Sequence, residues 1–127
     1  MDALLGGSIP ALESALHFRK LRSAALAANV SNADTPGYRR VDVSFAPALE
    51  AAAAALARTD ARHFSSAGNE GVEITEGPRG SRPDGNGVDR DQELLTFARN
   101  ASEFQDRAEI LTRIFTMRRM AATGELR

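Results

Sequence analysis

The histidines, cysteines and serines are the residues most often used for chemistry, and here they form no recognisable site. His17 and His63 are the only histidines among 127 residues, and neither stands at metal-ligand spacing from a second strong ligand. The chain has no cysteine, which excludes disulfides, thiolate catalysis and cysteine-ligated metals. It also has no Gly-x-Ser-x-Gly or Walker sequence. We therefore predict no catalytic, cofactor-binding or metal-binding residue.

The glycine-rich run from Asp84 to Asp89 begins like a calcium-binding loop. Val88, however, stands at the fifth position of such a loop, and Leu95 stands where a bidentate glutamate is required. The glycines also begin a dinucleotide fingerprint, but Arg90 occupies the third glycine position and no strand precedes the run. We interpret this run as a turn that leads into a helix.

The charge balance argues against nucleic acid and anionic membranes as partners. The formal net charge is −1. A local basic group in the first third is interpreted as solvated or interfacial: Arg19, Lys20, Arg22, Arg39 and Arg40. No stretch approaches the roughly 20 apolar residues that span a bilayer, and the first ten residues do not read as a Sec signal peptide. Secretion would therefore need another route.

A first helix is predicted from Ser8 to Asn32. Its apolar residues recur at spacings of three and four, and alanines beside them allow close helix packing. Thr35 is pushed out of the helical region by Pro36, and Pro36-Gly37 has the composition of a type II turn. The helix must therefore end just before this turn.

A second helix is predicted between Asp91 and Gly124. Strict three-four spacing predicts a coiled-coil seam toward the first helix, made of Leu94, Phe97, Ala101, Phe104, Ala108, Leu111 and Phe115. A separate stripe is predicted to contact neighbouring molecules, and it contains Ile110, Ile114, Met117 and Ala121. Two helices alone would not cover both stripes, so assembly with further helices is expected.

The middle of the chain has weaker signals. Residues 46–58 are rich in alanine and weakly helical, and residues 65–88 are rich in glycine and loop-like. Only Val72–Thr75 alternates like a strand, which needs a partner strand to be stable. We read residues 60–88 as an extended arm. The predicted fold is all-α: segments 1–44 and 89–127 pair their helices as a coiled coil in one domain, and segment 45–88 forms an extended loop with a short β element.

The string from Leu26 to Arg39 is more polar than an ordinary helix end. Asn29 and Asn32 are expected to cap carbonyls or to bond across a helix interface, and Tyr38 is expected to pack back on the helix. A helix end with a turn explains residues 32–37 but gives no reason for the whole string.

This string resembles the N-terminal signature of bacterial flagellar rod and hook proteins. That signature is written as Leu, two variable residues, then Asn-Ile-Ala-Asn-x-x-Thr-Pro-Gly-Tyr. Val30 and Ser31 are mild departures from it, and the remaining matches are Leu26, Asn29, Asn32, Thr35, Pro36, Gly37 and Tyr38. The resemblance covers about residues 9–50 and 84–120, and within the superfamily it is greatest to the proximal rod proteins.

The resemblance implies a structural subunit of the flagellar rod, which crosses the periplasm in the basal body. It implies export by the flagellar type III apparatus, which needs no cleaved signal. The implied partners are other rod subunits, the protein joining the rod to the MS ring, copies of this chain, and the export gate. Phe45 and Leu49 fit the Phe-x-x-x-aliphatic gate motif of such export substrates, although the pair could equally anchor the linker on the first helix.

Two other functions stay open from the residues alone. A cytoplasmic coiled-coil adaptor would have the same helices, but it leaves the signature spacing unexplained. A cofactor-independent enzyme is supported only by the presence of histidine and carboxylates. A folded pocket in the isolated monomer would favour the enzyme, and a protease-sensitive monomer would oppose it.

Overall fold

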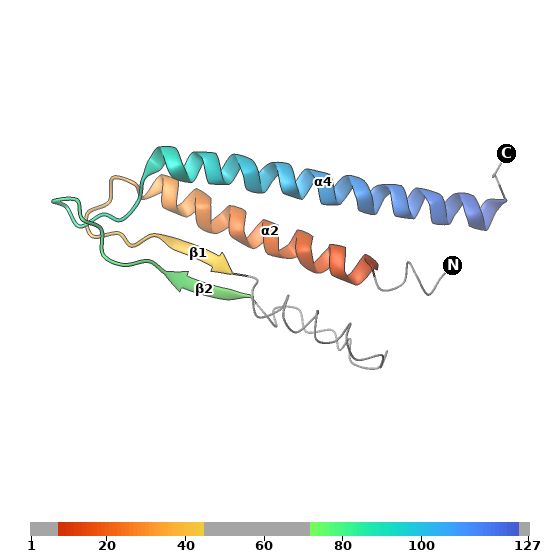
Figure 1. The fold of residues 1–127 in the computed structure, drawn as a ribbon, viewed down its shortest axis with the longest axis horizontal. Coiled ribbons are helices and arrows are strands. Elements are labelled where there is room, and N and C mark those ends of the chain that lie inside the picture. The colour runs from red at the N-terminus through yellow and green to blue at the C-terminus, as the bar shows by residue number, and fades with distance from the viewer. Residues whose placement is uncertain (1–7, 45–71, 125–127) are drawn as a thin grey trace.

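The computed structural model describes residues 8–44 and 72–124, which form two long helices and a small sheet. Helix α2 (Ser8–Ser31) and helix α4 (Arg90–Thr123) lie side by side and run in opposite directions, and the strands flank α2 (Figure 1). The predicted fold class, mostly helical with a short β middle, is confirmed. Residues 46–58 lie outside the described residues, and the three-segment division stays a prediction. Neither described helix has the length and apolarity needed to cross a membrane.

Turn and capping residues explain where α2 ends and where α4 begins and ends. After α2, the Tyr38 N–H donates to the Thr35 carbonyl at 3.2 Å, and Gly37 has φ of 71°, as the predicted type II turn requires. Before α4, the Asp89 carboxylate accepts hydrogen bonds from the N–H groups of Asp91 and Gln92. Gly124, in the left-handed conformation at φ of 70°, caps the end of α4.

Strand β2 (Glu73–Glu76) has the partner that the sequence left unidentified. It pairs antiparallel with β1 (Val41–Ser44), with Val43 opposite Ile74. Val43 is buried, whereas all four residues of β2 are exposed. Residues 73–88 of the predicted arm are held by β1 and by the turn after α2, as a segment that is not stable on its own requires. Residues 60–71 lie outside the described residues.

The contact between α2 and α4 uses a different face of α4 from the predicted one. Glu93, Asn100 and Ile114 are buried there, each one residue before a member of the predicted seam. Leu94 is 48% exposed and Phe104 is 38% exposed. The intramolecular seam prediction is therefore wrong for the exposed large residues, which we call the outer stripe: Leu94, Phe97, Phe104 and Phe115.

The second predicted stripe is also corrected by the structure, at Ile114. Ile114 was expected to contact neighbouring molecules, but it is buried within the chain, whereas Ile110 and Met117 are exposed. Leu111 is half-buried. The remaining apolar core is small and is spread along α2 and the junction below it: Ile9, Phe18, Leu26, Ala33, Val43 and Val88.

Candidate functional site

Asn29 lies at the centre of a polar junction between the two helices and β1. Its side chain is fully buried. The Nδ2 group donates to the Val41 carbonyl at 2.6 Å and to Glu93 Oε2 at 3.0 Å. The Oδ1 atom accepts from the Val41 N–H at 2.9 Å and from the Tyr38 hydroxyl at 3.2 Å. All four hydrogen bonds of the amide are made, so Asn29 fixes where the chain returns along α2.

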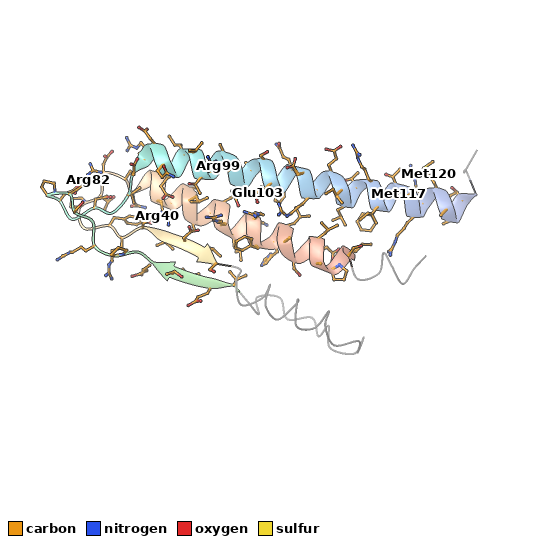
Figure 2. The ribbon with its side chains drawn as sticks, viewed as in Figure 1. Arg40, Arg82, Arg99, Glu103, Met117 and Met120 are labelled. Atoms are coloured by element: carbon orange, nitrogen blue, oxygen red, sulfur yellow. The ribbon has the colours of Figure 1, made fainter. Side chains whose placement is uncertain are left out.

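Glu93 extends this junction into a chain of alternating charges. Its carboxylate, 1% exposed as a residue, accepts from Asn29 and from Arg40 Nε. Arg40 also donates to Asp42 at 3.0 Å, and Asp42 accepts two hydrogen bonds from Arg22 at 2.9 and 3.2 Å. Figure 2 shows Arg40 where the strands meet the helices. The positive charges of the two arginines balance the negative charges of the two carboxylates, and this pairing offsets the cost of burying Glu93 away from water.

Asp42 has a pKa below its ordinary value. Burial alone would raise that pKa, but hydrogen bonds from Arg22, from the Val43 N–H and from Arg40 outweigh it. Because the pKa is lower in the folded than in the unfolded chain, Asp42 stabilises the fold above its unfolded pKa. That contribution is lost as the pH falls through the folded pKa.

We therefore expect acid to weaken the fold through Asp42. The free energy of unfolding, measured by urea titration between neutral pH and about pH 3, should decrease across the carboxylate range, and Asp42→Asn should flatten this decrease. An unchanged pH slope in Asp42→Asn would contradict the assignment.

The turn after α2 is fastened to the loop before α4. Asn86, which is buried, donates from Nδ2 to the carbonyls of Asn32 at 2.9 Å and Thr35 at 2.7 Å. Two backbone hydrogen bonds add to this: Gly37 N–H to the Asp84 carbonyl, and Gly87 N–H to the Tyr38 carbonyl. The two regions that carry the family resemblance are therefore in direct contact.

Gly80 is required for this close packing. A Cβ atom at Gly80 would lie 1.8 Å from the Asn86 carbonyl oxygen, a distance at which the backbone would have to move. The glycines of the loop before α4 indicate in the sequence that the backbone packs closely here. Their spacing does not identify the segment against which they pack.

The two asparagines of the signature make the two kinds of hydrogen bond expected of them. Asn32 caps the Ala28 carbonyl at 2.8 Å, Asn29 bonds across the helix interface, and Thr35 Oγ1 donates to Asn32 Oδ1. The remaining signature residues take simpler positions: Leu26 is buried, Val30 and Tyr38 are half-buried, and Pro36 and Gly37 are exposed. Phe45 and Leu49, the predicted export motif, lie outside the described residues.

Sequence reasoning missed most of the charges in the junction. In the sequence analysis, Arg22 and Arg40 are interpreted as solvated or interfacial, and Glu93 is assigned no role. Their buried contacts join residues 20 to 64 positions apart, so no local pattern marks them.

The polar groups of the site are occupied in holding the fold together. Among residues 8–44 and 72–124, no cluster of three or more acidic or histidine side chains is arranged to hold a metal ion. A cavity of about 450 Å³ beside the loop has Arg82 and Arg90 in its lining. Arg90 pairs with Asp34, and Arg82 donates to the carbonyls of Ala33 and Val88. These arginines therefore join the loop to the turn.

Comparison with known proteins agrees with the signature. Residues 10–39, which include most of α2 and the following turn, match the family model described as "Flagella basal body rod protein". Over 104 residues the chain is 36% identical to the flagellar basal body rod protein FlgB of Aeromonas hydrophila, covering 76% of this chain and 78% of the relative. The chain belongs to the FlgB family. The FlgB of Bacillus subtilis is 30% identical over 126 residues, covering 96% of this chain and 98% of the relative.

The similarity to FlgB proteins extends well beyond the residues of the signature. The FlgB of Salmonella typhimurium is 35% identical over 105 residues, covering 73% of this chain and 76% of the relative. The chain is thus a structural protein of the flagellar basal body rod, and its family is structural rather than enzymatic.

Proposed function

We propose that the chain is a subunit of the proximal rod, that it is exported by the flagellar type III apparatus, and that it assembles into the axial drive shaft. The observation that carries the assembly step is the outer stripe, four large apolar residues that α2 leaves exposed. Phe115, for example, is 50% exposed. Apolar area of this size on one helix is stabilised by burial against another surface.

The spacing of the outer stripe favours a helix as that surface. Leu94, Phe97 and Phe104 occupy the first, second and fourth positions of a three-four-three pattern, which faces a partner helix in a left-handed coiled coil. Half-buried Ala101 and Ala108 complete the pattern and permit close approach. A helix of a neighbouring rod subunit, or of a second copy, supplies this geometry. Exposed Ile110 and Met117 extend the assembly surface beside it.

The remaining partners follow from family membership together with the resemblance. They are other rod subunits, the protein that joins the rod to the MS ring, and the export gate. Phe45 and Leu49 are the proposed gate motif. No catalytic step, cofactor or nucleic acid enters this function.

Complementation tests the proposal. In a flagellated strain that lacks this gene, the intact chain should restore swimming and should be present in purified basal bodies. Phe45→Ala should leave the protein in the cytoplasm, whereas Asn29→Ala/Asn32→Ala should be exported but fail to assemble. A deletion strain that swims normally, with the protein retained in the cytoplasm, would contradict the rod function and favour an adaptor.

A further inference from the structure

Helix α4 carries two neighbouring stripes of residues that run along its length. The inner stripe consists of Glu93, Asn100, Arg107 and Ile114, spaced seven residues apart. Glu93, Asn100 and Ile114 are buried, and Arg107 is half-buried. Two residues of the outer stripe, Leu94 and Phe115, stand one residue after a member of the inner stripe, whereas Phe97 and Phe104 stand four residues after Glu93 and Asn100. One residue is about a 100° rotation of an α-helix and four residues are about 40° more than a full turn, so the outer stripe lies beside the inner stripe and at the edge of the contact with α2.

Apolar burial by itself favours the outer stripe. Three of its four residues are phenylalanine, whereas Ile114 is the only apolar member of the inner stripe. A smaller rotation of α4 would move Phe97 and Phe104 from the edge of the contact with α2 to its centre and would remove more apolar surface from water. The observed orientation must therefore depend on contacts that only the inner stripe makes.

Asn100 makes the first of these contacts, near the middle of the helix pair. It is 1% exposed. Its Nδ2 group donates to the Arg19 carbonyl at 2.9 Å and to Ser23 Oγ at 2.8 Å, and its Oδ1 atom accepts from Arg19 Nη1 at 3.3 Å. Rotating α4 would move the amide away from all three partners.

Glu93 makes the second contact, seven residues earlier and about 10 Å away along the helix axis. It holds Asn29 from α2 and Arg40 from the segment that precedes β1. Two polar layers on one face of a helix fix its rotation, just as a buried polar residue fixes the register of a coiled coil.

We propose that Glu93 and Asn100 are positioning residues that select which face of α4 packs on α2. They keep the less apolar face inward and so hold the outer stripe outward, where another helix can reach it. This selection takes place within one chain, and it holds whether or not the chain enters a rod.

A single introduced tryptophan reports the orientation of α4. The chain has no tryptophan of its own, so Phe104→Trp places the only indole on the outer stripe. Acrylamide quenching and circular dichroism are measured at a dilution at which the chain sediments as a monomer. Three proteins are compared: Phe104→Trp alone, the same chain with Glu93→Ala/Asn100→Ala, and the same chain with Glu93→Leu/Asn100→Leu.

The alanine and leucine pairs are matched to separate face selection from stability. Both pairs remove the polar contacts. The leucine pair makes the inner stripe apolar, so burying the inner stripe against α2 stays favourable. The alanine pair adds little apolar surface there, so burying the outer stripe against α2 becomes more favourable than burying the inner stripe. We expect the alanine pair to retain its helical signal and to lower the quenching constant of the introduced indole by about half, because the indole becomes packed against α2. The leucine pair should match the parent.

Three results would overturn the proposal. The first is equal quenching of the indole in all three proteins. The second is equal protection of the indole in the alanine and leucine pairs. The third is loss of the helical signal in the alanine pair, with the indole more exposed than in the parent, which would show that the polar layers only stabilise the fold.

Discussion

Phe104→Asp is expected to abolish assembly into the rod while leaving the helix pair folded. Phe104 lies on the outer stripe, and a carboxylate there would have to be buried without a partner when a second helix covers the stripe. Within one chain Phe104 is 38% exposed, so the substitution also removes part of its packing, and the free energy of unfolding should fall by about 1 to 2 kcal/mol. Swimming and the content of purified basal bodies measure assembly, and urea titration measures the fold.

The matched control for this prediction is Gln105→Asp. Gln105 is the next residue on α4, is also exposed, and stands outside the outer stripe. The Gln105→Asp substitution introduces the same negative charge one residue away from Phe104, and it should leave swimming unchanged. If Phe104→Asp still enters rods, the outer stripe is not the assembly surface.

Glu93→Ala is expected to be among the most destabilising single substitutions in the described residues. Removing this carboxylate leaves the Asn29 amide with an unpaired donor in the core and takes one of two acidic partners from Arg40. Breaking a buried pair in this way costs about 3 kcal/mol, the lower end of the usual range, because Arg40 keeps Asp42 and is partly exposed. The midpoint of urea unfolding, followed by circular dichroism, measures the loss.

Glu109→Ala provides the comparison on the same helix. Glu109 pairs with Arg113 one turn away, and both side chains are more than half exposed. Such a pair contributes less than about 0.5 kcal/mol. If the two alanine variants unfold at the same urea concentration, Glu93 does not hold the junction.

The bounds of both helices could be predicted because they depend on local chemistry. The apolar spacing, the Pro36-Gly37 turn and Gly124 all act over a few residues. The pairing of β1 with β2 joins segments about thirty residues apart, and nothing in Val41–Ser44 marks it as the partner. Strand pairing of this kind is decided by tertiary packing.

The seam of α4 could not be predicted from apolar periodicity for a specific reason. A search for apolar residues finds Leu94, Phe97 and Phe104, but it cannot find Glu93 and Asn100, whose burial depends on partners in α2. The seven-residue repeat was recognised correctly, but the predicted seam lies beside the face of α4 that carries the buried residues Glu93, Asn100 and Ile114. The signature residues could be identified because the whole string resembles a family, whereas their geometry required the folded chain.

The most direct test of the central claim is a photo-cross-link from the outer stripe in assembled basal bodies. A benzophenone amino acid placed at Phe104 keeps an aromatic side chain there and reacts with whatever lies against it. If α4 packs on its own α2 through Glu93 and Asn100 and offers the outer stripe to a neighbour, the product will have the mass of two rod subunits. A cross-link within one subunit, which has the mass of a single chain, would show that Phe104 faces inward and would contradict the claim.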